Sequence, residues 1–337
     1  MALDEFGLIR RYFARPGLES PGLRLGIGDD AALLDLPAGE TLAVSTDTLV
    51  AGRHFPHDAT PFDIGWKALA VNLSDLAAMG ARPLGVTLAL TLPEADEVWL
   101  AAFAEGFFAL ADGHGVPLIG GDTTRGPLSI TVTALGAVPP AQALRRDGAR
   151  ADDLLFVSGT LGDAGLGLAF ALAQPLSWLG EFPPAHRVHA LARLHRPTPR
   201  LALGQALRGI ASAAMDVSDG LLQDLGHLLA ASGLGAELQL EQLPLSPGLH
   251  YLAGEGGGAR QQVLSWALAA GDDYELLFSV APGQRGAVEA LARQLDLPLA
   301  CIGRLTSAGG LCLTWDGRPW EHERPFGYQH FRGAPDV

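Results

Sequence analysis

Apolar and polar positions follow two different periods along the first 140 residues, which predicts strands interleaved with helices. From Asp63 to Met79 the apolar residues recur at helical spacing, and Gly80 follows as a C-terminal cap. The same spacing predicts helices over Leu3–Phe13 and Ala95–Ala111. Strands are expected at Thr41–Val44, Leu84–Thr91, Val116–Ile119 and Ser129–Val138.

Pro139 and Pro140 interrupt this pattern and mark the best candidate for a domain junction, which divides the chain into 1–140 and 141–337. In the second part, helices are expected after the glycine-rich run Gly159–Gly167 and over Leu221–Ala231 and Gln284–Gln294. Strands are expected at Leu154–Val157, Ala213–Val217, Ala236–Leu240, Tyr274–Val280 and near Cys301 and Cys312. Gln174–Pro184 reads as an irregular insertion. The order of elements predicts two α/β or α+β domains.

The composition limits what this protein can bind. Its 337 residues exceed the roughly 100 to 200 of a typical domain, and 48% of them are hydrophobic, so folded cores are expected. The net charge of −14 argues against a nucleic-acid or anionic membrane surface, because such surfaces attract basic patches. No apolar run approaches the roughly 18 residues of a membrane span.

Lysine and cysteine usage excludes further classes of protein. Lys67, the sequence's sole lysine, follows Trp66, so it fits neither a Walker A loop nor the strand lysine of a protein kinase. Cys301 and Cys312 are too few and too far apart for a disulfide framework, which indicates a reducing compartment. Because the N-terminus is acidic where a signal peptide would be basic, we expect a soluble, cytoplasmic protein.

The candidate chemistry lies in aspartates near the ends of predicted elements. Each one alone reads most simply as a helix cap or turn residue. Together they are harder to dismiss, because several interrupt apolar sequence, where an unpaired carboxylate is costly to desolvate. Carboxylates without a His or Cys cluster favour a hard cation, Mg²⁺ before Zn²⁺. The set comprises Asp29, Asp30, Asp47, Asp75, Asp122, Asp216, Asp219, Asp272 and Asp273.

Spacing refines four of these positions. Asp47 follows Ser45 and Thr46 where we expect a strand to meet its loop. Asp75 and Asn72 share one face of the predicted helix. Asp216 and Asp219 could both reach one ion before a helix, or they could form a double N-cap.

Three other motifs have competing interpretations. Gly26–Ala31 fits the G-x-G-x-x-A of a dinucleotide site, but two carboxylates would face the pyrophosphate and Pro37 interrupts the segment where a helix should follow. His54 and His57 form an HxxH without a nearby third ligand for zinc, so His54 is more simply a contact for an anionic substrate. Arg146 is either a phosphate contact or an ordinary surface arginine.

Several runs, in order over nearly the whole chain, resemble the thiamine-monophosphate kinase family. This family belongs to the superfamily of aminoimidazole ribonucleotide synthetase and selenophosphate synthetase. The runs are GIGDDAA at Gly26–Ala32, STDTLVAGRHF at Ser45–Phe55, DIGWKALAVNLSDLAAMGARP at Asp63–Pro83, GGDTT at Gly120–Thr124, Arg146–Ala149 with the later VSGTLGDAGLGL, MDVSDGLLQDLGHLLAASGLG at Met215–Gly235, GDDYELL at Gly271–Leu277 and GYQHF at Gly327–Phe331.

The resemblance implies a fold and a reaction. Residues 1–140 would form an ATP- and metal-binding domain, whose mixed sheet pairs across a homodimer. Residues 141–337 would form an α/β sandwich that closes the cleft. ATP would bind with several Mg²⁺ ions and without a Walker loop. Its γ-phosphoryl group would pass to thiamine monophosphate, giving thiamine diphosphate and ADP.

Site residues are carried over from the family position by position. Asp122, Asp219 and Arg146 are expected to be catalytic, and His54, Asp272 and Tyr328 to hold thiamine monophosphate. At position 272 the family usually has Glu, so the shorter aspartate leaves its contact open. The expected ATP contacts are Gly121, Asp122, Arg146 and Ser218. The expected magnesium ligands are Asp30, Ser45, Thr46, Asp47, Asp75, Asp122, Asp216 and Asp219.

The chemistry of the residues agrees with such a reaction. A phosphate monoester has its second pKa near 6, so the acceptor is already a nucleophile and needs no general base. The obstacle is repulsion between two anions, which metal ions held by aspartates would remove.

Alternatives remain at this stage. Another ATP-dependent enzyme of the superfamily is the nearest rival, although selenophosphate synthetase is disfavoured because the N-terminal region has no cysteine. A dinucleotide-dependent oxidoreductase and a noncatalytic metal-binding module are rivals from other classes. Whether transfer is direct or passes through a phospho-enzyme stays open from spacing alone.

Overall fold

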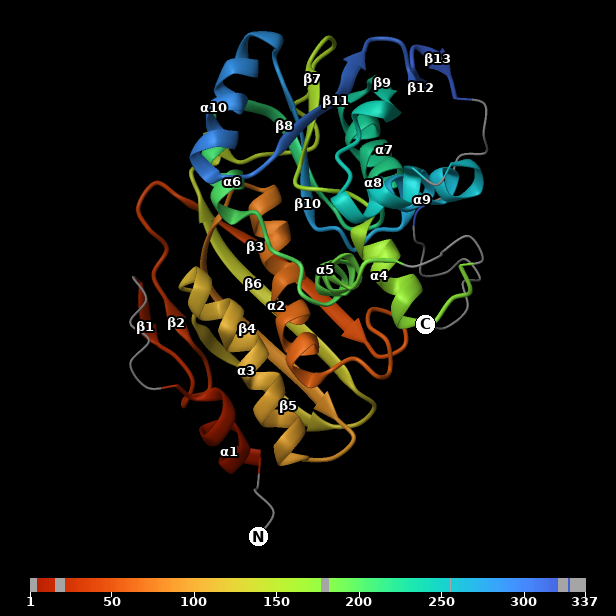
Figure 1. Ribbon diagram of the computed structural model, residues 1–337. Coiled ribbons are helices and arrows are strands. Elements are labelled where there is room, and N and C mark those ends of the chain that lie inside the picture. The colour runs from red at the N-terminus through yellow and green to blue at the C-terminus, as the bar shows by residue number, and fades with distance from the viewer. Residues whose placement is uncertain (1–4, 16–21, 177–181, 255, 321–326, 328–337) are drawn as a thin grey trace. The chain divides into compact units, whose positions relative to one another are not determined.

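The computed structural model describes residues 5–15, 22–176, 182–254, 256–320 and 327, which form two compact units. Unit 1 takes the described residues of 1–76 and 81–141, and unit 2 those of 77–80 and 142–334. Figure 1 shows their helices and strands along the chain. No helix among the described residues is long and apolar enough to cross a membrane.

Unit 1 is built on a four-stranded sheet, within the described residues, in the order β3-β6-β4-β5. Strand β6 pairs antiparallel with both β3 and β4, and β4 and β5 run parallel. The strands are β3 (Thr41–Val50), β4 (Arg82–Leu92), β5 (Leu118–Arg125) and β6 (Ser129–Val138), and the helices are α1 (Glu5–Leu8), η1 (Ile9–Phe13), α2 (Pro61–Ala78), α3 (Glu97–His114) and η2 (Pro140–Gln142). A small separate sheet pairs β1 (Leu23–Leu25) with β2 (Leu33–Leu34).

Helices α2 and α3 pack at unusually close range. A Cβ atom at Gly65 would lie 2.1 Å from the Phe103 carbonyl oxygen, and one at Gly106 would lie 1.9 Å from the Phe62 carbonyl oxygen. Only glycine permits such an approach of two backbones. Both helices lie against the sheet (Figure 1), and the strand residues Leu88, Leu90 and Val132 are buried. This packing fixes α2 relative to the strands.

Unit 2 contains a seven-stranded sheet, within the described residues, in the order β13-β12-β9-β11-β7-β10-β8. Its strands are β7 (Leu154–Ser158), β8 (Ala211–Val217), β9 (Gly235–Gln239), β10 (Glu275–Val280), β11 (Leu299–Thr306), β12 (Gly310–Trp315) and β13 (Arg318–Pro319). The α-helices are α4 (Asp163–Ala171), α5 (Pro184–His195), α6 (Leu201–Ala206), α7 (Leu221–Ser232), α8 (Pro247–Gly254), α9 (Gly257–Ala269) and α10 (Arg285–Leu295), with 3-10 turns η3 (Leu240–Gln242) and η4 (Pro282–Gln284).

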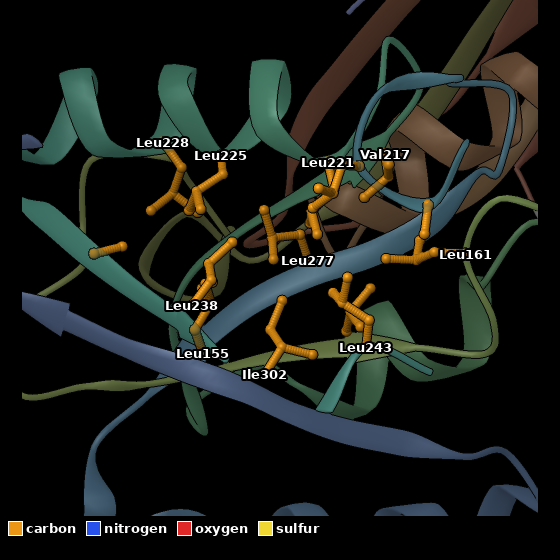
Figure 2. Packing of buried hydrophobic residues seen from close by; sticks show 14 of the residues in the cluster. Leu155, Leu161, Val217, Leu221, Leu225, Leu228, Leu238, Leu243, Leu277 and Ile302 are labelled. Carbon is orange, nitrogen blue, oxygen red and sulfur yellow. The ribbon is translucent and has the colours of Figure 1, made fainter. Parts of the chain in front are cut away.

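The core of unit 2 lies between helix α7 and the sheet. Figure 2 shows Leu221, Leu225 and Leu228 on one face of α7, directed toward the strands. They belong to the same buried cluster as Leu277 on β10 and Ile302 on β11. Replacing a fully buried leucine such as Leu225 with alanine would cost about 2–5 kcal/mol. The core therefore anchors the loop that leads from β8 into α7.

Most predicted elements are found close to their expected limits. Strand β6 has the predicted bounds, and α2 begins and ends within two residues of Asp63 and Met79. The helix expected over Leu3–Phe13 is split into α1 and a π-helical turn, and residues 1–4 lie outside the described part. Residues 177–181 of the predicted insertion also lie outside it.

Candidate functional site

Strand β3 and helix α2 bring three of the predicted metal ligands together in unit 1. The hydroxyl group of Ser45 donates a short hydrogen bond to the carboxylate of Asp75. The main-chain N–H of Asp47 donates to Asn72 Oδ1 at 3.1 Å. Asn72 and Asp75 are therefore on the face of α2 that meets β3, as their spacing predicts. This group of Ser45, Asp47, Asn72 and Asp75 is called the β3–α2 cluster below.

The prediction that Ser45–Asp47 mark the end of a strand is wrong. Strand β3 continues to Val50, and its antiparallel register with β6 is regular from Thr41 to Val50. Threonines sustain this longer strand, because Thr46 and Thr48 pair with Thr133 and Thr131 through hydroxyl contacts of 2.9 and 2.8 Å. The polar residues thus lie within the sheet.

The register separates the remaining unit 1 ligands. Thr46 pairs with Thr133 and Asp47 with Val132, so their side chains point to opposite faces of the sheet. Across the sheet, Asp122 pairs with Ala89, Ala89 pairs with Thr131, and Thr131 pairs with Thr48. The side chain of Asp122 therefore lies on the same face of the sheet as that of Thr48, opposite to the face of Asp47. Thr46 and Asp122 are therefore not part of the β3–α2 cluster.

Gly121 has a backbone that other residues rarely adopt. Its φ is +152°, and a Cβ atom there would lie 1.9 Å from the Leu88 carbonyl oxygen on β4. Asp122 follows directly and is exposed. The space that a side chain would take at Gly121 is filled by the β4 backbone, so the close approach of the two strands requires glycine here, while the residue itself stays exposed.

Asp30 lies on the connection between β1 and β2. Its N–H donates to the neighbouring Asp29 Oδ1 at 2.9 Å. The chain then forms β2, paired antiparallel with β1, where a dinucleotide site would need a helix. The structure therefore excludes the dinucleotide interpretation of Gly26–Ala31.

Hydrogen bonds of its ring and of its main chain place His54 in unit 1. Its Nδ1 accepts from the Val50 N–H at 3.0 Å, and its carbonyl oxygen accepts from the ammonium of Lys67 at 3.0 Å. Lys67 is buried, so the single lysine of the sequence has a structural contact. Nδ1 acts as an acceptor here, which leaves the imidazole edge at Nε2 as the donor in the neutral ring.

In unit 2, strand β8 carries Asp216, and the loop from β8 into α7 carries Ser218 and Asp219. Asp216 is buried within β8, and Asp219 Oδ2 accepts a hydrogen bond of 3.1 Å from Gln223. The N-cap of α7 is Gly220, which makes no side-chain capping bond. The double N-cap alternative for Asp216 and Asp219 is therefore wrong.

Asp224 is a residue of this site that the sequence analysis missed. Its Oδ2 accepts hydrogen bonds from the N–H groups of Ser218 and Asp219, at 2.9 and 3.0 Å. It lies on the apolar face of α7, between Leu221 and Leu225, and is buried. The sequence did contain a signal for this residue, because a carboxylate at a position of the apolar face of a helix needs a polar partner.

The environment of Asp224 favours its protonated form. Burial and the nearby charge of Asp219 raise the pKa of Asp224 to about 7, although the two N–H donors and the charge of Arg146 act in the opposite direction. Arg146 is therefore close enough to act electrostatically on this loop, and its carbonyl oxygen accepts from Ser232 at 2.7 Å.

Asp272 joins the same group of residues. Its N–H donates to the Ser218 carbonyl oxygen at 2.8 Å, and its carboxylate accepts from the Tyr274 hydroxyl at 3.1 Å. The later Gly327 packs here too, since a Cβ atom on it would lie 2.5 Å from the Asp219 carbonyl oxygen. Tyr328 itself lies outside the described residues. Arg146, Ser218, Asp219, Asp224 and Asp272 form what we call the β8–α7 cluster.

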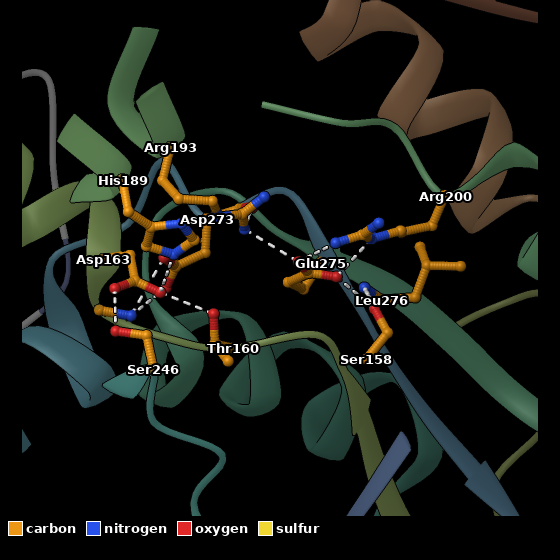
Figure 3. Close-up of polar contacts among 11 residues, drawn as sticks. Ser158, Thr160, Asp163, His189, Arg193, Arg200, Ser246, Asp273, Glu275 and Leu276 are labelled. Atoms are coloured by element: carbon orange, nitrogen blue, oxygen red, sulfur yellow. Dashed lines mark hydrogen bonds and ion pairs between the residues drawn. The ribbon is translucent and has the colours of Figure 1, made fainter. Parts of the chain in front are cut away.

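A buried acidic network lies next to Asp272 (Figure 3). Glu275 accepts from Arg193 at 2.9 Å, from Arg200 at 2.6 and 2.5 Å, and from Ser158 at 2.6 Å. Asp273 accepts from the Gly162 N–H through both oxygens. None of these side-chain partners was a predicted site residue.

The two aspartates of this network titrate in opposite directions. Burial raises the pKa of Asp273 well above its usual range, against the charge of Arg193 and the Gly162 N–H. Burial also disfavours ionised Asp163, but hydrogen bonds from His189, Ser246 and Thr160 outweigh it and lower its pKa. The two buried carboxyl groups, Asp163 and Asp273, thus have pKa values shifted in opposite directions.

Oxygen donors dominate both clusters. Carboxylate and hydroxyl oxygens without sulfur ligands fit Mg²⁺ better than a soft metal. Within the described residues, no group of three or more His, Cys, Asp or Glu side chains is arranged to hold a metal ion by itself. The donor chemistry thus fits magnesium, with β3–α2 and β8–α7 as separate groups of ligands.

Comparison with known proteins identifies both halves of the chain. Residues 28–138 match the AIR synthase related protein N-terminal domain, and residues 150–316 match the corresponding C-terminal domain. These matches confirm the predicted α/β fold class.

Proteins that match this chain over nearly its full length are named as kinases. Thiamine-monophosphate kinase from Salmonella typhimurium is 50% identical over 98% of this chain and 99% of its own. The crystal structure of thiamine-monophosphate kinase from Stenotrophomonas maltophilia is 53% identical, with a TM-score of 0.84 over 94% of this chain and 98% of that one. AaThiL, complexed with AMPPCP and TMP, is 33% identical, with a TM-score of 0.75 over 97% of each chain. The chain thus belongs to the thiamine-monophosphate kinase family, as the ordered motifs of its sequence predict.

Proposed function

We propose that this protein transfers the γ-phosphoryl group of ATP to thiamine monophosphate and releases thiamine diphosphate and ADP. The observation that carries the proposal is the similarity, over 97% of the chain, to AaThiL complexed with AMPPCP, an analogue of ATP, and TMP. This activity would be the last step in making thiamine diphosphate.

In the proposed reaction, a phosphate oxygen of thiamine monophosphate attacks the γ-phosphorus. A new P–O bond forms, and the bond from the γ-phosphorus to the β,γ-bridging oxygen breaks, leaving ADP with its electron pair. The acceptor phosphate is largely doubly ionised at neutral pH, so no side chain has to remove a proton. The protein's task is then to bind, orient and stabilise charge.

The proposed nucleotide contacts are Gly121, Asp122, Arg146 and Ser218. Gly121 and Asp122 are adjacent exposed residues of β5 in unit 1, while Arg146 and Ser218 belong to the β8–α7 cluster of unit 2. A guanidinium suits a phosphate group because it donates two parallel hydrogen bonds. Asp122, Asp219 and Arg146 are the proposed catalytic residues.

Oxygen ligands from both clusters would hold Mg²⁺. When bound, the ions would screen the repulsion between two anionic substrates and stabilise charge on the transferred group. The contacts of Ser45 with Asp75 and of Asp224 with the Asp219 N–H hold these ligands in place before any ion binds. The proposed ligands are Ser45, Asp47 and Asp75 of the β3–α2 cluster and Asp219 of the β8–α7 cluster, together with Asp30, Thr46, Asp122 and Asp216, which lie outside both clusters.

Thiamine monophosphate would contact His54, Asp272 and Tyr328. A carboxylate such as that of Asp272 suits the positively charged thiazolium ring of thiamine. The imidazole of His54, with Nδ1 already accepting from Val50, would present its Nε2 edge to the substrate.

A homodimer formed through unit 1 is part of the proposal. The even-numbered residues of β3 line one face of an edge strand, and Leu42 and Val44 are 46% and 57% exposed there. An exposed apolar strand surface of this kind favours pairing with another sheet, and the family resemblance makes a second copy the partner. Light scattering should give twice the chain mass for the wild type and the chain mass for Val44→Glu, while a monomeric wild type would refute the dimer.

The net charge of −14 supports a protein that binds neither nucleic acid nor membrane. The free cysteines Cys301 and Cys312 support a reducing compartment, and a cytoplasmic location is part of the proposal.

Calorimetry with product analysis tests the proposed function. ATP should bind tightly with Mg²⁺ and weakly in EDTA, and adding thiamine monophosphate should yield ADP and thiamine diphosphate in equal amounts. A failure to form thiamine diphosphate would refute the assignment. Metal uptake without ATP turnover would instead indicate a noncatalytic metal-binding protein.

A further inference from the structure

The loop Gly271–Tyr274, directly before β10, holds an unusual backbone. Gly271, Asp272 and Tyr274 have φ values of +73°, +59° and +49°. Aspartate tolerates the left-handed region better than most residues, but a tyrosine there is strained. Such conformations persist where the surrounding contacts fix them, and they gather at functional sites.

Asp273 and Arg193 supply contacts that fix this loop. The Asp273 carboxyl group accepts the Gly162 N–H at 3.0 and 2.9 Å. Arg193 Nη2 donates to the Asp273 carbonyl oxygen at 2.8 Å and to Glu275 Oε1 at 2.9 Å. Arg193 therefore holds the chain on both sides of the strained Tyr274, as Figure 3 shows for its bond to Glu275.

Tyr274 links the backbone of this loop to the side chain of Asp272. Its hydroxyl group donates to Asp272 Oδ1 at 3.1 Å, and its N–H donates to the Val217 carbonyl oxygen at 2.8 Å. The direction of the Asp272 carboxylate thus depends on where the tyrosine backbone is held.

The glycine-rich run Gly159–Gly162, directly before α4, makes room for the buried side chains of Asp273 and Glu275. Gly162 has a φ of +86° and directs its N–H to Asp273. A Cβ atom at Gly159 would lie 2.1 Å from Glu275 Oε1. The N-terminal end of α4 is thus filled by a carboxyl group of the protein itself, so this run serves the Asp272 loop and not a phosphate.

Neutralising the charge of Glu275 does not by itself explain why Arg193 is present. Glu275 already accepts two hydrogen bonds from Arg200 and one from Ser158. Arg193 Nε is buried and has no hydrogen-bond partner among the described residues, which is a cost in stability. The contact that distinguishes Arg193 from Arg200 is its bond to the Asp273 main chain.

We propose that Arg193 and Asp273 are positioning residues that hold the Gly271–Tyr274 loop so that Asp272 can bind thiamine monophosphate. The inference rests on the proposed function, since Asp272 is a substrate contact only there. It predicts a defect specific to thiamine monophosphate when the main-chain contact is lost.

Steady-state kinetics of Arg193→Met tests the inference. The variant should raise KM for thiamine monophosphate about tenfold or more while KM for ATP stays within about twofold, because only the acceptor side loses its support. Arg193→Lys should restore most of the affinity, since an ammonium group can still donate to the carbonyl oxygen. Equal increases in both KM values, or a change in melting temperature alone, would overturn the proposal.

Two further variants separate positioning from folding. Arg200→Lys alters the same buried Glu275 without touching the loop backbone, so it should lower the melting temperature and leave both KM values unchanged. Tyr274→Phe removes the hydroxyl group that donates to Asp272 and should raise KM for thiamine monophosphate even if Arg193→Met fails to fold. An unchanged KM in Tyr274→Phe would contradict the inference.

Amide hydrogen exchange tests the positioning role without measuring enzyme activity. In the ligand-free protein, the amides of residues 272–275 should exchange at least about tenfold faster in Arg193→Met than in the wild type. Equal protection would refute the positioning role, even if the wild type makes thiamine diphosphate. An inactive wild type with the expected loss of protection would instead refute the proposed function.

Discussion

The carboxyl group of Asp224, inside the first turn of α7, accepts a hydrogen bond of 3.0 Å from the main-chain N–H of Asp219. The same oxygen accepts from Ser218 at 2.9 Å. A buried residue on a helix therefore fixes the loop that carries a proposed catalytic aspartate. The main chain of this loop is thus held by a buried carboxyl group, while Asp219 Oδ2 accepts a hydrogen bond of 3.1 Å from Gln223.

Asp224→Leu should lower kcat about tenfold or more, because two N–H groups lose their acceptor and the Asp219 loop loses its position. The loss should also cost about 1–3 kcal/mol of stability. Asp224→Asn keeps an acceptor oxygen and should retain most activity, and the exposed Glu289→Gln serves as the control. Wild-type kcat in a folded Asp224→Leu would show that the contact has no role in catalysis.

Asp122→Ala and Asp219→Ala should each lower turnover about 100-fold or more, because charged ligands of the reacting groups are lost. Neither should disturb the fold, since Asp122 is exposed and Asp219 is only half-buried. Thermal unfolding with and without EDTA provides the check. A large fall in melting temperature on adding EDTA would make these residues part of a structural metal site.

Gly121→Ala should destabilise unit 1 by about 2 kcal/mol or more, because its φ is +152° and the new methyl group would meet the Leu88 carbonyl oxygen. The matched control is Gly113→Ala in α3, where a Cβ atom meets nothing within 4 Å. That variant should stabilise the helix by about 0.5–1 kcal/mol. Urea unfolding compares the two, and an equally stable Gly121→Ala would contradict the close approach of β4 and β5.

Asp273 should make the stability of the metal-free protein depend on pH. Its folded pKa is raised, so its contribution is fully present below the unfolded value of about 4 and is lost as pH rises toward the folded value. Asp163 acts in the opposite sense, because its pKa is lowered and its contribution is lost as pH falls below about 4.

Urea unfolding in EDTA from about pH 5 to pH 8 isolates Asp273 from Asp163. The wild type should lose stability relative to Asp273→Asn as pH rises, by at most about 1.4 kcal/mol per pH unit. The exposed Asp316→Asn should follow the wild type. Parallel pH curves for the wild type and Asp273→Asn would show that Asp273 keeps an ordinary pKa in the folded protein.

The sequence predicts the elements well because their signals are local. Strand Ser129–Val138 and the helix beginning near Asp63 follow from periodicity and caps within a few residues. The face shared by Asn72 and Asp75 follows from helical geometry alone, and both side chains do contact β3.

Long-range pairing limits the prediction of the site. No local pattern shows that β3 continues past Asp47, because its extension depends on pairing with β6, 79 to 83 residues away in sequence. The same holds for Arg193, whose partners Asp273 and Glu275 lie 80 and 82 residues away. Asp224 carried a local signal, a carboxylate on an apolar stripe, but its partners lie in the preceding loop.

Transfer of labelled phosphate tests the central claim most directly. With ATP carrying ¹⁸O in its γ-phosphoryl group, thiamine monophosphate and Mg²⁺, phosphorus NMR should show the label in the terminal phosphate of thiamine diphosphate. The signal should grow as that of thiamine monophosphate declines. Label found only in inorganic phosphate, or no loss of thiamine monophosphate, would contradict the assignment of this protein as a phosphotransferase acting on thiamine monophosphate.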